Sequence, residues 1–424
     1  MRALLLTVGS QGDVQPYVAL ASRLRGAGHD VVLAAPAVYQ GLAPAPAGTF
    51  VPLDLDMAEV GRAVDGKHGL RHMLAFTKAM GRQAGKVLPQ LTDLAREGAD
   101  IVVHHPVLPL GQHLAEMLQV PAVVASPLPA LVPTREFLSP AWPAANLKPS
   151  PMLNRPSYRA ARYLTGAWCR KDVDHWRAES LGLDNSKKKR HDPLAADDVT
   201  VLHAFSAHVL PRPHDWPATT HITGYWFMPK AADWTPPRRL AEFLDGGQPP
   251  VYIGFGSMPV ADPARLADAI VTATKETGTR AVLYSLDPSV RRQLSQQQQI
   301  MVIRQAPHHW LFPRMSAVVH HGGAGTTGAA VRAGTPQVIW PFGIDQHFWA
   351  DRMATLGVAV PAKPVHTLTG KTLASTIDQA IGDKTLRDEA ARLANRVRAE
   401  DGTGAAVAHL EKLATSRTRI RVPA

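Results

Sequence analysis

Residues 316–353 contain the side chains best suited to chemistry in this chain. A short apolar run leads into two histidines, His320 and His321, and then into a glycine-rich bend, after which we expect a helix to begin at Thr326 or Thr327. Such a bend directs backbone N–H groups at one point, and the positive end of the helix adds to their effect. The pattern therefore predicts a phosphate-binding site.

A second predicted strand, residues 337–340, ends in a loop that contains an adjacent acid and amide, Asp345 and Gln346. Ligands of α/β sheets bind at the carboxyl ends of strands. A diphosphate cradle beside a paired acid and amide indicates a site for a nucleotide sugar.

Residues 323–328 also match the glycine fingerprint of dinucleotide-binding folds, with Asp345 at a suitable distance downstream. A nicotinamide-dependent oxidoreductase is therefore the alternative enzyme class. The fingerprint does not follow the first strand of its half of the chain, however. Asp345 also lies in a loop beyond Pro341 and is paired with Gln346, which a ribose contact does not require.

A candidate general base, Asp13, follows the first predicted strand in residues 8–13, Val-Gly-Ser-Gln-Gly-Asp. Gly9 and Gly12 allow the backbone to approach a ligand closely. A carboxylate at the carboxyl edge of the sheet could accept a proton from a substrate hydroxyl. Aspartate is also a favoured helix N-cap, and Pro16 suits a first helical turn, so a purely structural role is the alternative.

Two further strand ends carry polar candidates. His104 and His105 end a predicted strand, and one of them could orient Asp13 or line an acceptor pocket; a buried structural histidine is the alternative. Gly256 and Ser257 follow the first strand of the second half and could reach the same diphosphate, unless they form an ordinary turn.

We expect no metal and no resident cofactor. Adjacent side chains at a strand end point to opposite sides, so His320 and His321 are poorly placed to bind one ion, and no Cys or acidic partner lies near them in sequence.

The bulk composition indicates a globular protein of two domains, since 424 residues with 45% hydrophobic content exceed one typical core. The single cysteine, Cys169, allows no internal disulfide and fits a cytoplasmic protein. No apolar run approaches the length of a membrane-spanning helix. The apolar N-terminus is short and lacks a cleavage site, so we interpret it as a buried strand.

The net charge of +11 comes from basic residues that are spread along the chain. The one dense run, residues 187–190, is predicted to be a solvated loop, with a lipid or nucleic-acid patch as the alternative. We expect no nucleic-acid partner, and the charge would support weak peripheral contact with an anionic membrane. Oligomeric state is left open.

Apolar strands alternate with helices in both halves, which predicts parallel sheets covered on both faces. The expected domains are residues 1–224, a Pro- and Gly-rich linker over 225–250, residues 251–400, and a tail over 401–424. Strands are predicted at 3–8, 31–35, 101–104, 122–125, 251–255, 281–284, 301–304, 317–320 and 337–340. We predict a helix over 15–27, irregular chain over 127–156, and two final helices broken at Asp401-Gly402.

The run His320 to Thr327, followed by Pro341-Phe342 and Asp345-Gln346, resembles the donor-binding signature of glycosyltransferase family 1, which has the GT-B fold. It is most similar to that of sterol glucosyltransferases and actinobacterial natural-product glycosyltransferases. The resemblance implies an α/β protein with two doubly wound Rossmann-like domains facing across a cleft. It also implies that the last helix crosses back onto the N-terminal domain.

For the donor, the resemblance implies that His320 faces the phosphate, that His321 is structural, and that Asp345 and Gln346 contact sugar hydroxyls. Ala306 would lie near the nucleotide base, although the aromatic residue that often precedes it in the family is Gln305 here. The other implied donor contacts are Gly256, Ser257, Gly323, Ala324, Gly325 and Thr326.

For the reaction, the resemblance implies an inverting, metal-independent transfer with Asp13 as base. The donor would be a UDP-hexose, most simply UDP-glucose, with a TDP-deoxysugar as the alternative; a binding module without turnover is the non-enzyme alternative. The acceptor would be a sterol or a polyketide-like metabolite. The candidate acceptor contacts, which could equally be ordinary core residues, are Gly12, His105, Phe76, Met80, Phe137 and Trp142.

Overall fold

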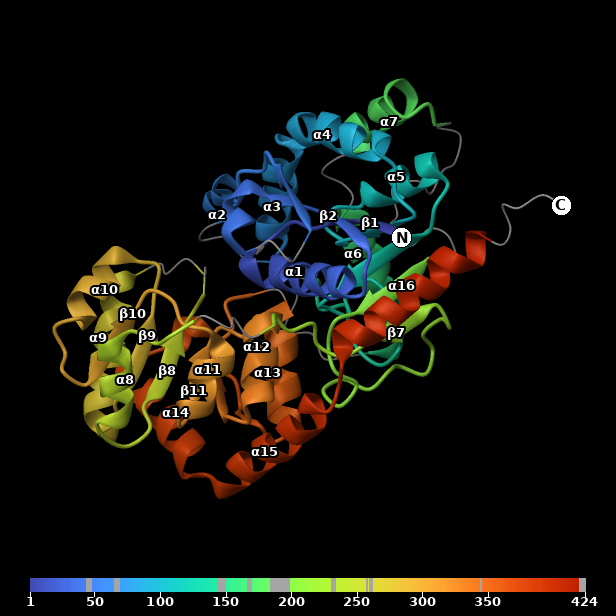
Figure 1. Cartoon of the computed structure of the whole chain (residues 1–424). Helices are drawn as coiled ribbons and strands as arrows, with labels where there is room; N and C mark the ends of the chain where they lie inside the picture. Colours follow the sequence, from blue (N-terminus) through green and yellow to red (C-terminus); the bar gives the residue numbers. More distant parts are fainter. Residues whose placement is uncertain are drawn as a thin grey trace. The chain divides into compact units, whose positions relative to one another are not determined.

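The computed structural model describes residues 1–42, 48–64, 69–142, 150–165, 170–183, 199–229, 234–256, 258, 262–343 and 345–418. The chain divides into two compact units, which Figure 1 shows coloured along the sequence. Unit 1 comprises Met1–Ala207, Pro211–Pro229 and Asp401–Ala424, and unit 2 comprises His208–Leu210 and Lys230–Glu400. One passage between the units, at residues 229 and 230, falls inside the range predicted as a linker. The helix α8 (Arg238–Asp245) in that range already belongs to unit 2.

Unit 1 is built on a seven-stranded sheet in the order β3-β2-β1-β4-β5-β6-β7, in which every neighbouring pair is parallel. Its three central strands, β1, β4 and β5, are buried at almost every position, as expected for a parallel sheet that helices cover on both faces. The strands are β1 (Arg2–Leu6), β2 (Asp30–Pro36), β3 (Thr49–Leu53), β4 (Ile101–His104), β5 (Ala122–Ser126), β6 (Thr200–His203) and β7 (Thr220–Ile222).

The two faces of this sheet form separate cores. Leu4 and Leu6 of β1 pack in one core with α4 and α5 side chains such as Leu91 and Leu114, and Leu5 packs in the other with α1. The helices of unit 1 are α1 (Gln11–Gly26), η1 (Ala37–Leu42), α2 (Met57–Val64), α3 (Gly69–Gly81), α4 (Ala84–Arg96), α5 (Gly111–Leu118), α6 (Pro151–Thr165), α7 (Arg170–Glu179) and α16 (Gly402–Thr418).

The last helix, α16, belongs to unit 1 although 171 residues of unit 2 precede it directly in the chain, from Lys230 to Glu400. Its buried residues Ala406, Val407 and Leu410 lie in the same core as Tyr17 of α1, and Figure 1 shows α16 beside β7. A Cβ on Gly402 would lie 2.4 Å from the carbonyl oxygen of Tyr225, so the helix can start this close to the backbone only at a glycine. The crossing-back of the last helix is thereby confirmed.

Unit 2 has a six-stranded, fully parallel sheet in the order β10-β9-β8-β11-β12-β13. Its strands are β8 (Val251–Gly254), β9 (Ala281–Tyr284), β10 (Ile300–Ile303), β11 (Val318–His320), β12 (Gln337–Ile339) and β13 (Ala359–Val360). Its other helices are α9 (Pro263–Thr277), α10 (Pro288–Leu294), α11 (His308–Leu311), η4 (Phe312–Arg314), α12 (Ala324–Ala333), α13 (Asp345–Thr355), η5 (Val365–Thr367), α14 (Gly370–Gly382) and α15 (Lys384–Arg398).

Three predicted boundaries are wrong. Helix α1 begins at Gln11 rather than residue 15, because Ser10 is its N-cap, and Pro16 therefore lies inside the helix. Helix α12 begins at Ala324 rather than at Thr326, since Gly323 is already its N-cap. The irregular stretch from residue 127 gives way to helix α6 at Pro151. Among the described helices, none is long and apolar enough to cross a bilayer.

Candidate functional site

The Asp13 carboxylate lies at the carboxyl edge of the unit 1 sheet, in the first turn of α1. Its Oδ2 atom accepts hydrogen bonds from the Ser10 backbone N–H (2.7 Å) and the Ser10 hydroxyl (2.9 Å). Asp13 is therefore the third helical residue reaching back to the N-cap, and Ser10, not Asp13, is the cap itself. The carboxylate retains 25% exposure, so one oxygen is anchored while the group still meets solvent.

His105 approaches the other carboxylate oxygen of Asp13. Its Nε2 atom lies 3.6 Å from Oδ1, and its Nδ1 atom accepts a hydrogen bond from the Val107 backbone N–H at 3.3 Å. That bond favours the tautomer with the proton on Nε2, which faces Asp13. Burial by itself raises the pKa of Asp13, but the interactions with His105 and Ser10 more than offset it, so the net pKa lies below its ordinary value. Asp13 is ionised at neutral pH.

Gly9 makes this arrangement sterically possible. Its φ of +128° lies in a region that L side chains rarely adopt, and a Cβ there would lie 2.4 Å from Oδ2 of Asp13. Two tyrosines flank the carboxylate. The Tyr17 ring lies 6.2 Å from the His105 ring, and burial followed by the Asp13 charge raises the pKa of Tyr39 to about 12. Both phenols are therefore neutral at the pH where Asp13 is charged.

In unit 2, His321 occupies the predicted phosphate cradle. A Cβ on Gly256 would meet the His321 ring at 2.9 Å, and one on Gly323 would meet its Nε2 atom at 2.5 Å. The imidazole therefore lies against two glycine backbones, from the loop after β8 and from the N-terminus of α12. Burial lowers the pKa of His321 to about 4, and its buried Nδ1 atom has no hydrogen-bond partner. This ring is a neutral group with unused hydrogen-bonding capacity.

His320 has the opposite environment. The side chain is fully buried, its Nε2 atom lies 3.0 Å from Oε1 of Gln337 on β12, and its Nδ1 atom accepts from the Gly322 backbone N–H. Burial lowers the pKa of His320 to about 3. Both ring nitrogens are thus used within unit 2, whereas His321 has a nitrogen without a partner; which histidine faces the phosphate stays a prediction.

Gln346 and Asp345 also differ. The side chain of Gln346 is buried, its Oε1 atom accepts from the backbone N–H groups of Phe342 and Gly343, and its Nε2 atom lies 3.1 Å from Sδ of Met258. The amide therefore shapes the loop after β12. Asp345 is the first residue of α13 and remains partly exposed. The two members of the predicted pair therefore have different surroundings.

The remaining predicted donor residues surround the same loops. Ala324, Gly325 and Thr326 form the first turn of α12 and are partly or fully exposed. Ala306 precedes α11, where the His308 ring stacks on Phe312 at 4.2 Å between centroids. Ser257 lies outside the described residues.

The predicted acceptor residues lie on several elements of unit 1, and their role stays a prediction. Met80 is fully buried in the core under α4, with Phe76 packed against it. The Phe137 ring lies 6.5 Å from that of Tyr158, and Trp142 donates its backbone N–H to Ser139. Gly12 is the second residue of α1, beside Asp13. Of this set, Gly12 and His105 lie at the base.

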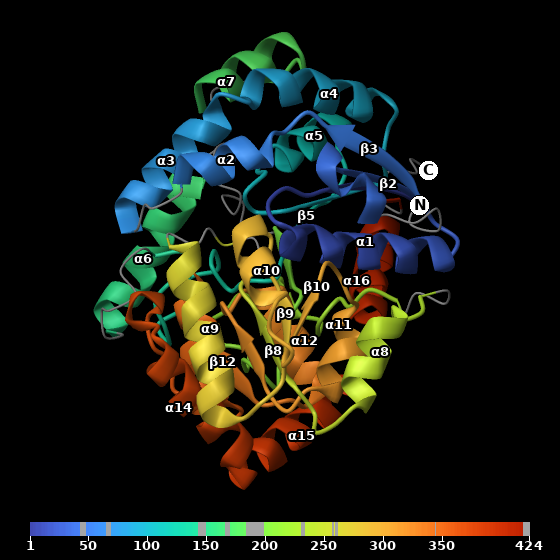
Figure 2. The same ribbon diagram turned by 90° about the vertical axis from the view of Figure 1, so that its left-hand side faces the viewer.

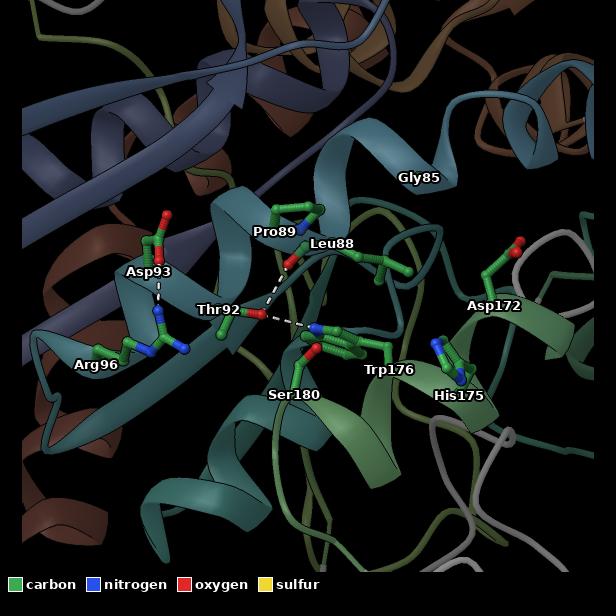
Figure 3. Close-up of a pocket in the computed structure, with 10 residues that line it drawn as sticks. All are labelled: Gly85, Leu88, Pro89, Thr92, Asp93, Arg96, Asp172, His175, Trp176 and Ser180. Carbon is green, nitrogen blue, oxygen red and sulfur yellow. Dashed lines mark hydrogen bonds and ion pairs between the residues drawn. The ribbon is translucent and has the colours of Figure 1, made fainter.

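A cavity of about 540 Å³ lies elsewhere in unit 1, between α4 and α7. Among the residues that line it, Figure 3 shows Trp176 donating its indole N–H to the Thr92 hydroxyl and an ion pair between Asp93 and Arg96. None of the predicted site residues lines it. Residues 187–190 and Cys169 lie outside the described part of the chain.

Sequence reasoning missed four supporting residues: Ser10, Val107, Gln337 and Met258. The spacing Ser10-x-x-Asp13 is a capping-box signature and could have identified Ser10. No local signal marks the other three, since each acts through a contact with a distant or backbone atom.

Comparison with known proteins covers both units. The model of the glycosyltransferase family 28 N-terminal domain matches residues 3–134, and that of the erythromycin biosynthesis protein CIII-like C-terminal domain matches residues 262–413. The chain is 33% identical to O-mycaminosyltylonolide 6-deoxyallosyltransferase of Streptomyces fradiae, over 100% of both chains.

It is also 33% identical to a sterol 3-beta-glucosyltransferase of Emericella nidulans, over 99% of this chain and 31% of the relative. The chain thus spans about a third of the length of the fungal sterol glucosyltransferases that it matches. Among solved structures, glycosyltransferase VinC in complex with dTDP has a TM-score of 0.69 at 20% identity, with coverage of 98% of this chain and 100% of that one. This likeness shows the shared fold.

Proposed function

The chain belongs to the GT-B glycosyltransferases, and from this we propose that it transfers a hexose from a nucleoside-diphosphate sugar to a hydroxyl of an apolar acceptor, with inversion. The comparisons give no support to the oxidoreductase alternative for residues 323–328. Transfer requires a base for the acceptor, stabilisation of the leaving diphosphate and alignment of the two substrates. The first two can be assigned to residues.

We assign the base to Asp13, and its orientation carries this proposal. Ser10 holds Oδ2, His105 faces Oδ1, and the pKa of Asp13 stays below its ordinary value. The carboxylate would accept the proton of the acceptor hydroxyl as that oxygen forms its bond to the anomeric carbon. The bond from that carbon to the phosphate oxygen breaks at the same time, and the nucleoside diphosphate leaves with the electron pair. Attack from the face opposite the leaving group gives inversion.

We assign the diphosphate to the Gly323–Thr326 turn and to His321, in place of His320. Backbone N–H groups in the first turn of α12 would bind the phosphate oxygens, and the unused His321 nitrogen would add a donor. Full activity in EDTA is expected, and a complete loss that added Mg²⁺ restores would overturn this assignment. Asp345 would select sugar hydroxyls. A cytoplasmic location is part of the proposal, because one cysteine allows no internal disulfide.

The donor is proposed to be UDP-glucose, in keeping with the sterol glucosyltransferase relatives. A TDP-deoxysugar is the second candidate, because the relative matched over its full length is a 6-deoxyallosyltransferase. The acceptor would be a sterol or a polyketide-like metabolite. The test incubates the protein with UDP-glucose or TDP-glucose and a panel of hydroxylated sterols and macrolides. Nucleotide release with a hexose mass gain is expected; tight NADH binding without either would overturn the proposal.

A further inference from the structure

Exposed hydrophobic side chains gather on two helices of unit 1. Among the described residues, six large hydrophobic side chains are more than half exposed, and four of them lie on α3 and α6: Leu74, Met152, Leu153 and Tyr163. Helices α3 and α6 contact each other, and Figure 2 shows them adjacent at one side of the unit. We call this the α3–α6 surface. Single exposed apolar residues are ordinary, but a group of this kind marks an interaction site.

One side of helix α6 is exposed and carries apolar side chains together with an arginine. Met152, Pro156, Arg159 and Tyr163 are separated by four, three and four residues, so they form one stripe of the helix. All four are exposed, Met152 at 85% and Tyr163 at 63%. The opposite stripe is the buried one and comprises Asn154, Ser157, Tyr158 and Ala161. The outward stripe therefore combines apolar and basic side chains.

The charged side chains on α3 and α6 are all basic. Neither helix contains Asp or Glu, whereas helix α2, which contacts α3, contains Glu59. Exposed cations on the two helices are Arg71, Lys78, Arg155 and Arg159. Arg155 lies 3.5 Å from Asp215 of a neighbouring loop. The remaining three extend the positive charge across both helices.

We propose that the α3–α6 surface docks the protein on an anionic lipid bilayer. Entering the acyl region stabilises methionine and leucine side chains, and tyrosine prefers the membrane interface. Lysine and arginine contact the headgroups while their aliphatic stems stay in apolar surroundings. Nucleic acid would use the cations but not exposed Met152 and Leu153. A symmetric contact with a second copy would place this positive surface against itself. The inference goes beyond the proposed function and does not depend on it.

The test measures co-sedimentation of the full chain with vesicles of phosphatidylcholine containing about one-third phosphatidylserine, compared with phosphatidylcholine alone, at low and high salt. Binding only to the anionic vesicles, weakened by salt, is expected. The variant Met152→Ser/Leu153→Ser/Arg159→Glu should bind at least about tenfold more weakly, because it removes two inserting groups and reverses one charge. Thermal melting of each variant checks folding.

A matched control, Val38→Ser/Leu286→Ser/Arg396→Glu, changes the other two exposed hydrophobics and an exposed arginine on α15, and should bind like the wild type. Equal losses in both variants would show that only bulk charge matters and would overturn the proposal. Absence of vesicle binding would do so as well. Loss of a dimer in the first variant, seen by light scattering without vesicle binding, would assign the surface to a second copy instead.

Discussion

The carboxyl edges of the two sheets share one plan and use it differently. In unit 1, β1 ends in a glycine bend that holds a charged side chain, Asp13, by hydrogen bonds from Ser10. In unit 2, β11 ends in a glycine bend that brings backbone N–H groups and a neutral ring, His321, together. One edge presents a negative charge, and the other presents groups that suit a negative ligand.

This difference follows from what surrounds each bend. Ser10 and His105 supply donors to Asp13, so ionisation is favoured despite burial. His321 is surrounded by glycine backbone and by the neighbouring His308, so burial keeps it neutral. A doubly wound sheet therefore prescribes where a ligand group lies, while its charge is set by side chains from adjacent loops.

The largest effect is expected when the charge of Asp13 is removed from the unit 1 edge. Asp13→Asn should lower turnover about 10²- to 10⁴-fold, because it removes the base but leaves an oxygen for Ser10. Affinity for bare UDP or TDP should not change, since the residues proposed to bind the donor are in unit 2. Ser10→Ala is the control: the backbone N–H that binds Oδ2 remains, so the variant should lose about 1 kcal/mol of stability and little turnover. If both variants lose turnover equally, the carboxylate acts only as part of the cap.

Acid should lower the stability of both units over the same pH range. Burial lowers the pKa of five histidines to about 3 or 4: His104, His203, His308, His320 and His321. Histidines in the unfolded chain have a pKa of about 6.5, so below this pH the unfolded chain binds protons at histidines that stay neutral in the folded protein. The free energy of unfolding should therefore fall between pH 6.5 and 4, by about 1.4 kcal/mol per pH unit for each histidine.

Urea denaturation followed by tryptophan fluorescence at pH 7 and pH 5 measures this loss of stability. We expect the free energy of unfolding of each unit to fall by several kcal/mol between the two pH values. His320→Gln cannot titrate and should reduce the dependence on pH by about one proton. Equal stability at the two pH values would contradict the assignment of buried neutral histidines.

At the carboxyl edge of the unit 2 sheet, substitutions of the two adjacent histidines should have different effects. His321→Ala should raise the KM for the nucleotide sugar about 10- to 100-fold through the loss of one hydrogen bond to a charged group. His320→Ala should instead lower stability by about 1–3 kcal/mol, since Gln337 and the Gly322 N–H lose their partner, with donor affinity nearly retained. Steady-state kinetics and denaturation on both variants decide this, and the reverse pattern would restore His320 as the phosphate contact.

The smallest effect distinguishes Asp345 from Gln346. Gln346→Ala should cost about 1–3 kcal/mol of stability, because two backbone N–H groups lose their acceptor, and should affect UDP and UDP-glucose equally. Asp345→Ala should leave stability nearly unchanged and weaken binding of UDP-glucose more than that of UDP. Calorimetric titration with both ligands makes the comparison. Selective loss of UDP-glucose binding in Gln346→Ala would show that the amide contacts the sugar.

Nine strands were predictable because they are largely apolar runs, whereas β3, β6, β7 and β13 were not predicted. The two glycine bends were predictable because glycine and strand end coincide in sequence. The sequence did not predict the direction in which individual side chains point. Adjacent residues at a strand end point to opposite faces, but the pattern does not say whether His320 or His321 faces inward. The same limit applies to Gln346, whose partners are the backbone atoms of its own loop. Asp13 differs, since its spacing from Ser10 is a local signal.

The return of α16 to unit 1 has a consequence for synthesis on the ribosome. Ala406, Val407 and Leu410 complete the core around Tyr17, but they are translated after all of unit 2. Unit 2 has its whole sequence available earlier, so it can finish folding while the first-made half still exposes the apolar groove that α16 fills. The core of unit 1 is therefore expected to be completed last, and its apolar surface stays exposed until α16 has been made.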